Sequence, residues 1–139
     1  GYRSFAGGAS GTVYVAYSRA DGTYTNGPPT VKELTSTGTA DIGANPVFDA
    51  EGFDIELVSI GTDLILSTST DSTYKYVNLR ALDTSADTPA WELLSTENEF
   101  KGIDQALAVG ADGVLFHTFT NRTDSGSAAY GNPSVFAFE

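Results

Sequence analysis

Carboxylates are the most abundant side chains in this chain that could do chemistry. The chain has 18 Asp and Glu residues, a single histidine and no cysteine. The acids gather in two segments, from Asp41 to Glu56 and from Glu92 to Asp104. Glycoside hydrolases use two carboxylates roughly 5–10 Å apart, and Asp54, Glu56 and Asp104 lie near the ends of predicted strands. Sugar hydrolysis is therefore one candidate function, weighed against chance proximity in so acidic a chain.

The single histidine, His117, lies in the middle of a predicted strand near Phe116 and Phe119. A general base or a metal ligand would be the chemical use of such a residue. No neighbouring His or Cys supports a metal site, and no G-x-S-x-G motif supports a Ser-His-Asp triad. We therefore expect a hydrogen-bonded strand histidine, and we assign no catalytic residue and no metal ligand.

Calcium binding is a second use of acidic segments, because calcium takes about six to eight oxygen ligands. Two segments carry spaced side-chain oxygens, from Asp49 to Asp54 and from Asn121 to Gly126, but neither has the spacing of an EF-hand loop. Solvated loops are the favoured interpretation, with calcium as a weaker alternative. No phosphate loop, dinucleotide fingerprint or basic patch indicates any other cofactor.

Aromatic side chains offer a third chemistry, the stacking of sugar rings on an apolar face. The chain has one Trp and seven Tyr, and most of these tyrosines stand at alternating strand positions typical of a core. Tyr24 and Tyr130 instead fall in loops rich in Gly, Asn and Thr. With Trp91, these two tyrosines are our candidate ligand-binding residues.

The formal net charge of −11 limits the classes of molecule that this protein is expected to bind. Such a surface repels nucleic acid and anionic lipid, and no apolar run approaches the roughly 18 residues of a membrane span. Neutral ligands such as glycans remain compatible. The chain begins at Gly1 rather than methionine, which suggests a processed end or a fragment. We expect an extracellular or cell-surface protein.

Three stretches that align almost without gaps must position these side chains. They are Arg3–Ser18, Glu56–Thr70 and Gln105–Thr120. Each reads as an apolar strand, a tight turn and a second apolar strand. Glycines take the same place in each alignment, 53 and 49 residues apart: Gly8, Gly61 and Gly110. Neither face of the first strands is charged, so we expect these strands to be buried on both sides. A period of about 50 residues predicts a repeat architecture.

Further strands follow each hairpin. The third strands are predicted at Pro29–Leu34, Tyr74–Leu82 and Pro133–Phe138. A fourth strand is clear only at Ala90–Ser95, with a poorer one within Thr39–Phe48, and none follows the last hairpin before Glu139. No segment reads as a confident helix, although 98–104 is expected to hold a short helical turn.

The segment from Trp91 through Gln105 to His117 resembles the blades of propeller lectins and related Asp-box repeats, in which a Trp ends one blade and a hairpin opens the next. The segment from Ser18 to Tyr24 is similar to an Asp-box, with Tyr in place of the usual Trp and altered spacing. This resemblance implies a β-propeller. No ligand-binding residue is transferred from the family.

The predicted fold is therefore one all-β domain or fragment, 1–139, of three blade-like antiparallel repeats of about 50 residues. The repeats span approximately 1–50, 51–100 and 101–139, and the last lacks its final strand. Closed propellers have about four to eight blades. The chain is then a fragment of a larger propeller, or half of a six-bladed ring of two copies. The alternative is a β-sandwich or jelly roll whose open edge meets another subunit.

Three functions remain open. The leading hypothesis is a secreted or surface, non-enzymatic module that binds a glycan. The second is a self-assembling structural or surface protein completed by strand addition between subunits. The third is a fragment of a propeller glycoside hydrolase.

Overall fold

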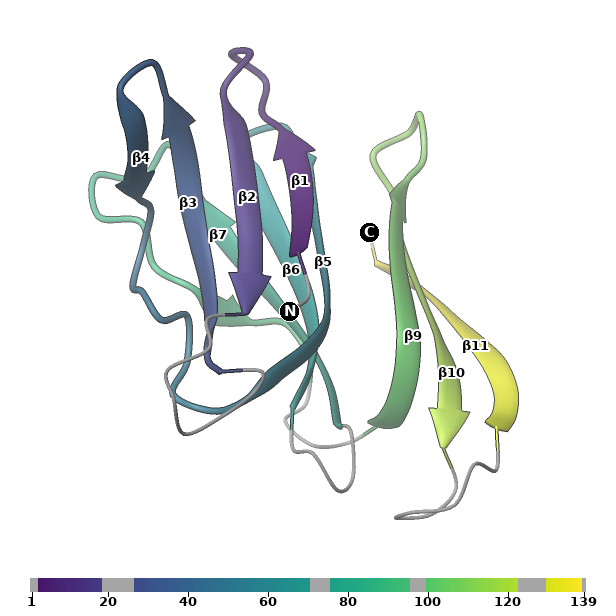
Figure 1. The fold of residues 1–139 in the computed structure, drawn as a ribbon. Coiled ribbons are helices and arrows are strands. Elements are labelled where there is room, and N and C mark those ends of the chain that lie inside the picture. Colours follow the sequence, from purple (N-terminus) through teal and green to yellow (C-terminus); the bar gives the residue numbers. More distant parts are fainter. Residues whose placement is uncertain (1–2, 19–26, 71–75, 96–99, 123–129, 139) are drawn as a thin grey trace.

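The computed structural model of this chain is an all-β protein, as the sequence predicts. It describes residues 3–18, 27–70, 76–95, 100–122 and 130–138. Within these residues there is no helix, and the strands form two antiparallel sheets, neither closed into a barrel (Figure 1). The helical turn expected at 98–104 is wrong for its described part, because residues 100–104 belong to a strand.

The first sheet is a four-stranded antiparallel meander. Its strands are β1 (Arg3–Gly7), β2 (Val13–Ser18), β3 (Pro29–Thr35) and β4 (Gly38–Asp41), paired in that order. Along β2 the buried residues Tyr14 and Ala16 alternate with Val13, Val15 and Tyr17, which are exposed or half-buried, as expected of a pleated strand with one buried face. We call this sheet the first meander.

The second sheet joins two further meanders at one edge. The second meander contains β5 (Gly52–Ile60), β6 (Asp63–Thr70), β7 (Tyr76–Asp83) and the short β8 (Glu92–Leu93). The third contains β9 (Phe100–Val109), β10 (Leu115–Arg122) and β11 (Tyr130–Phe138). Sheet order is β11-β10-β9-β7-β6-β5, with β8 beside β7. The start of β9 pairs with the start of β7, and β9 to β11 then diverge from β5 to β7 (Figure 1).

The first and third hairpins have the same turn. Gly8 N donates to Thr12 O at 2.7 Å, and Gly110 N donates to Val114 O at 2.9 Å. One residue of each turn has a left-handed backbone, Gly11 with φ 80° and Gly113 with φ 84°. That conformation strains any residue with a Cβ, so these two glycines are required by the turn.

The middle hairpin is shorter, which corrects the alignment of the repeats. Ile60 pairs directly with Asp63, so Gly61 and Thr62 alone form a two-residue turn. Two-residue hairpins close on a hydrogen-bonded pair, and Gly8 and Gly110 occupy such pairs in the other hairpins. The structural equivalent of Gly8 and Gly110 is therefore Ile60, not Gly61, and the repeats lie 52 and 50 residues apart.

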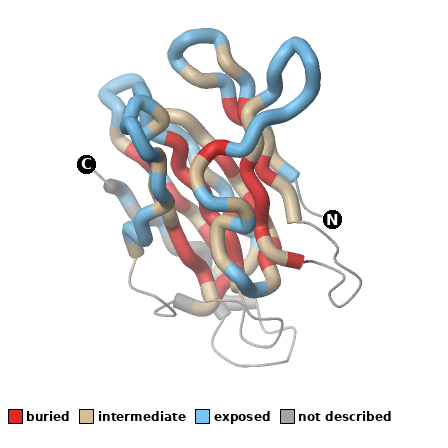
Figure 2. Tube along the Cα trace, turned by 90° about the vertical axis from the view of Figure 1, so that its left-hand side faces the viewer, coloured by how far each residue is buried: buried red, intermediate tan, exposed pale blue. Residues whose placement is uncertain are grey.

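Apolar clusters cover both faces of the second meander. The first cluster lies between the first and second meanders and contains Ala6, Tyr14, Ala16, Val31, Ile42, Ile55, Leu57, Leu64, Leu66 and Leu82. The second lies between the second and third and contains Ile65, Leu79 and Leu115, with Val58, Ile60, Ala81 and Leu107 packed against it. The six residues from Leu64 to Ser69 are all buried, as expected of a strand with a sheet on each side. Figure 2 shows this buried interior.

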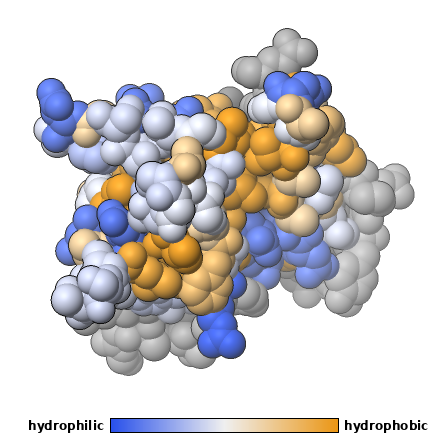
Figure 3. All heavy atoms as spheres, turned by 90° about the horizontal axis from the view of Figure 1, so that it is seen from above, coloured by the Kyte–Doolittle hydropathy of each residue, from blue (hydrophilic) through white to orange (hydrophobic). Residues whose placement is uncertain are grey.

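The expectation that all first strands are buried on both faces is correct only for β5. Phe5 on β1 is 59% exposed, and Ala106 and Ala108 on β9 are exposed. The reason is that the first and third meanders each have a neighbouring sheet on one side only. Apolar side chains consequently reach the surface alongside hydrophilic ones (Figure 3).

Candidate functional site

Of the three candidate ligand-binding residues, only Trp91 has a side chain within the described part of the chain. Trp91 is half-buried, lies beside Gly43 and packs against the first apolar cluster. Its Nε1 is buried without a hydrogen-bond partner among the described residues. Tyr24 lies outside the described residues. Tyr130 begins β11, and its side chain is likewise outside the described part of the chain.

A polar network lies buried between the second and third meanders. His117 on β10 and Gln105 on β9 are only 3% and 6% exposed, and Ser67 on β6 is fully buried. His117 Nε2 lies 2.8 Å from Ser67 Oγ and 3.0 Å from Gln105 Oε1. Gln105 Nε2 donates to Ser69 Oγ at 2.8 Å and to Asp54 O at 3.4 Å. His117 is thus the hydrogen-bonded strand histidine that the sequence favours.

The protonation of this network follows from its partners. Burial lowers the pKa of His117 from 6.5 to about 4, so the imidazole is neutral at pH 7. With its proton assigned to Nε2, His117 donates a hydrogen bond to Gln105 Oε1, which also accepts one from the Ser67 hydroxyl. The side-chain amide of Gln105 then makes all four of its hydrogen bonds, two as donor through Nε2 and two as acceptor through Oε1. Because the Ser67 hydroxyl is fully buried and donates to an amide, we interpret the network as structural.

The carboxylates considered for hydrolysis lie at irregular points of the first strands. Asp54 and Asp104 have left-handed backbones, with φ 48° and 54°, next to register shifts in β5 and β9. Glu56 is half-buried, and burial raises the pKa of its carboxyl, while Ser4 Oγ donates to it at 3.3 Å. Among the described residues, no group of three or more acids, histidines or cysteines could hold a metal ion.

The two bulges reveal a repeated motif that the sequence reasoning missed. Gly52-Phe53-Asp54 and Gly102-Ile103-Asp104 lie 50 residues apart at the same place in their meanders. A Cβ on Gly52 would approach Pro29 to 3.1 Å, and one on Gly102 would approach Phe119 to 2.5 Å and Val77 to 2.8 Å. These glycines are therefore needed for close packing on the preceding meander. The Gly-x-Asp spacing was visible in the sequence and could have corrected the alignment.

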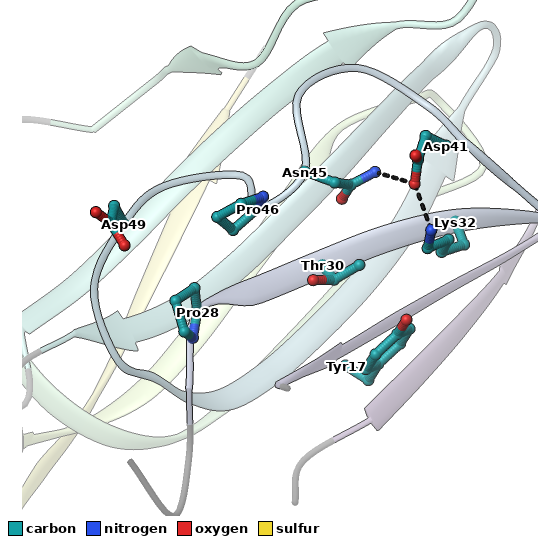
Figure 4. A pocket seen from close by; sticks show the side chains of 8 residues that line it. All are labelled: Tyr17, Pro28, Thr30, Lys32, Asp41, Asn45, Pro46 and Asp49. Atoms are coloured by element: carbon teal, nitrogen blue, oxygen red, sulfur yellow. Dashed lines mark hydrogen bonds and ion pairs between the residues drawn. The ribbon is translucent and has the colours of Figure 1, made fainter. Parts of the chain in front are cut away.

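A groove of about 520 Å³ crosses the outer face of the first meander (Figure 4). Its lining residues come from β2, the residue before β3, β3 itself, the end of β4 and the segment 42–51: Tyr17, Pro28, Thr30, Lys32, Asp41, Asn45, Pro46 and Asp49. In Figure 4 the Tyr17 ring lies on one side of β3, and Asn45, Pro46 and Asp49 lie on the other. An aromatic wall thus faces a polar wall.

Asn45 holds the polar wall against β3. Its Oδ1 accepts from Val31 N at 2.9 Å, and its Nδ2 donates to Val31 O at 2.9 Å and to Asp41 Oδ1 at 3.0 Å. Val47 N then donates to Pro29 O at 2.8 Å. The amide continues the backbone pairing of β3 beyond the end of β4, so the segment that forms the groove follows the sheet edge.

The charges of the groove are partly fixed by pairing. Lys32 Nζ donates to Asp41 Oδ1, and this bond holds the pKa of the Asp41 carboxyl below its usual value. Asp41 therefore stays ionised near neutral pH, with its charge balanced by Lys32. Asp49 adds a further acidic group at the other end of the groove. This charge set disfavours an anionic ligand.

Comparisons with protein-family models, curated proteins and solved structures found no match to this chain. Within the part of the chain that the structure describes, no helix is long and apolar enough to cross a membrane.

Proposed function

We propose that this chain is a non-enzymatic binding module that holds a neutral, carbohydrate-like ligand in the groove over β3. The observation that carries the proposal is the pairing of the Tyr17 ring with the carboxylates and amide of the opposite wall (Figure 4). An apolar ring face and a few polar groups are typical of small-molecule sites. The volume of about 520 Å³ also lies in the range of such sites.

The chemistry of the groove favours hydroxyl-bearing ligands. Asp41 and Asp49 carry acceptor oxygens, and Lys32 and Thr30 carry donors. Sugar hydroxyls both donate and accept hydrogen bonds, so they can use both sets, while the apolar face of the sugar can stack on Tyr17. An acidic protein with a neutral ligand fits the extracellular or surface setting proposed from the sequence.

Ligand binding can be tested with the full chain on a glycan array, followed by calorimetry on any hit. Tyr17→Ala is expected to weaken the affinity about tenfold or more, because the stacking face is lost. Tyr76→Ala is the matched control, since Tyr76 is also a half-buried strand tyrosine but does not line the groove. Tyr24→Ala and Tyr130→Ala test the two loop tyrosines. An array without hits, or equal affinities for Tyr17→Ala and Tyr76→Ala, would contradict the proposal.

We also propose that the three meanders are arranged as successive propeller-like blades, although a sandwich arrangement fits the two sheets equally well. The proposal is supported by the repeated hairpins and by Gly52 and Gly102, which pack on Pro29 and Val77. Those two partners are equivalent, because Pro29 pairs with Ser18 and Val77 pairs with Ser69 at matching hairpin positions. Successive meanders therefore meet through matching residues.

A further inference from the structure

Two apolar faces remain uncovered in the described structure, one at each end of the stack of meanders. On the outer face of the first meander, Phe5 is 59% exposed, and Val13 and Leu34 are also exposed. On the outer face of the third, Phe116 is 39% and Val135 is 64% exposed. Exposed apolar residues grouped on a sheet face, rather than scattered singly, mark an interaction surface.

The residues of the first uncovered face have equivalents that are covered elsewhere in the same chain. Thr12, Asp63 and Val114 pair with Gly8, Ile60 and Gly110 across the three hairpin turns. Counting from these second-strand residues, the position of Val13 corresponds to Leu64 and Leu115. Leu64 packs toward the first meander, and Leu115 packs toward the second. In both cases this position faces the preceding meander. The outer face of the first meander is therefore the face on which a preceding meander would sit.

The residues of the second uncovered face have equivalents that face the following meander. Phe116 corresponds to Tyr14 and Ile65. Tyr14 packs toward the second meander, and Ile65 packs toward the third. This position faces the following meander in both cases. The two uncovered faces are thus the two halves of an interface that the chain already forms twice inside itself.

We propose that a second copy of this chain docks head to tail, with the outer face of its third meander against the outer face of the first meander. The inference rests on the proposed blade arrangement and goes beyond ligand binding. The partner is a copy of this chain because its own third meander carries the matching face. A head-to-tail contact closes a ring if its rotation permits and otherwise continues as a filament.

Two properties of the chain bear on this contact. Each copy has a formal net charge of −11, so repulsion opposes association and added salt is expected to favour it. Tyr17 and Lys32 of the groove lie on the same outer face as Phe5. A docked copy would therefore cover part of the groove, and a ligand bound there is expected to shift the full chain toward the monomer.

The test is the molar mass of the full chain, measured by sedimentation velocity at several concentrations in about 0.5 M salt, where the Debye length is only a few Å. The wild type is expected to associate. Phe5→Asp and Phe116→Asp each place a charge on one of the two faces. Each variant alone is expected to be monomeric, because every head-to-tail contact needs both faces. An equal mixture of the two variants keeps one intact pair of faces, so it is expected to form a one-to-one dimer.

The control is Leu94→Asp, since Leu94 is another exposed apolar residue and follows β8 instead of lying on either face. It is expected to associate like the wild type. Circular dichroism confirms that each variant is folded, and Val135→Asp replaces Phe116→Asp if the latter unfolds. A wild type that stays monomeric at all concentrations would overturn the proposal and point to a different occupant of the two faces. If the wild type associates but an equal mixture of folded Phe5→Asp and Phe116→Asp chains stays monomeric, the head-to-tail geometry is wrong. Neither result depends on whether a glycan binds.

Discussion

Replacing the buried polar network by its apolar counterpart is the sharpest test of the packing between meanders. The three positions of Ser67, Gln105 and His117 at the second interface correspond to those of Ala16, Ile55 and Leu66 at the first. The first set is apolar and belongs to the first cluster. The triple variant Ser67→Ala, Gln105→Ile, His117→Leu therefore transplants one interface onto the other.

The expected effect of the single change Gln105→Ile is a loss of stability of about 2–4 kcal/mol. Gln105 bonds to Ser67, Ser69, His117 and the Asp54 carbonyl. After its loss, Ser67 and His117 can still pair at 2.8 Å, and Ser69 still donates to Gly102 O at 3.1 Å. One or two buried groups then lack partners, at about 1–3 kcal/mol each.

The triple variant is expected to recover most of that loss. Replacing Ser67 and His117 together with Gln105 leaves neither of those two side chains buried without a partner, and such replacements are often near neutral. Ser69 still donates to Gly102 O, and the Asp54 carbonyl loses its amide partner in both variants. The Gln105→Ile and triple variants differ only in whether the polar side chains of Ser67 and His117 remain. We therefore expect their free energies of unfolding at pH 7 to differ by about 2 kcal/mol or more, with the triple variant the more stable.

The same variant removes a pH dependence. The pKa of folded His117 is about 4, below its ordinary value of 6.5, so the unfolded chain binds its proton first as pH falls. The stability that the neutral residue contributes is complete above pH 6.5 and is lost progressively as pH falls from 6.5 to 4. The loss is about 3 kcal/mol in total, because each pKa unit corresponds to about 1.4 kcal/mol.

Urea unfolding at pH 7 and pH 4.5, followed by Trp91 fluorescence and circular dichroism, measures both effects. Other titrating groups are common to both chains, so the comparison between wild type and triple variant isolates His117. An equal loss of stability in wild type and triple variant would refute the assignment of a buried neutral imidazole. A triple variant no more stable than Gln105→Ile would refute the equivalence of the two interfaces.

Three further predictions concern the first meander. Gly11→Ala is expected to cost about 1–2 kcal/mol, because φ at this residue is 80°, whereas Gly7→Ala, with open space around its Cβ, is expected to be nearly neutral in the same urea titration. Asn45→Ala is expected to cost about 1–3 kcal/mol, because the backbone N–H and C=O of Val31 lose their amide partner, and amide exchange at Val31 would report the opening. Lys32→Ala is expected to change stability by less than about 1 kcal/mol, since its ion pair with Asp41 is exposed; a larger change in thermal unfolding would contradict that interpretation.

The hairpins could be predicted closely from the residues. The aligned stretches predict second strands that end at Ser18, Thr70 and Thr120. These strands are observed at Val13–Ser18, Asp63–Thr70 and Leu115–Arg122. β-branched and aromatic residues bounded by Gly and Asp identify such strands with little help from tertiary contacts.

The starts of the first strands could not be predicted as well. β5 begins at Gly52 and β9 at Phe100, earlier than the aligned stretches at Glu56 and Gln105. Gly and Asp normally indicate turns. Here a bulge holds Asp54 in a left-handed conformation within the strand, and bulges depend on the partner strand as much as on the local residues.

The sequence by itself determines which side chains share a strand face, because alternation along a strand follows from its geometry. Only the tertiary structure decides which of those faces another sheet covers. His117 and Val15 occupy equivalent positions, yet His117 is buried against Ser67 and Val15 lies on an outer face. The groove beside Tyr17 is equally a tertiary feature, since it forms where Asn45 anchors a distant segment to β3. Burial depends on what packs against a residue, and for His117 the packing partner, Ser67, lies 50 residues away in the sequence.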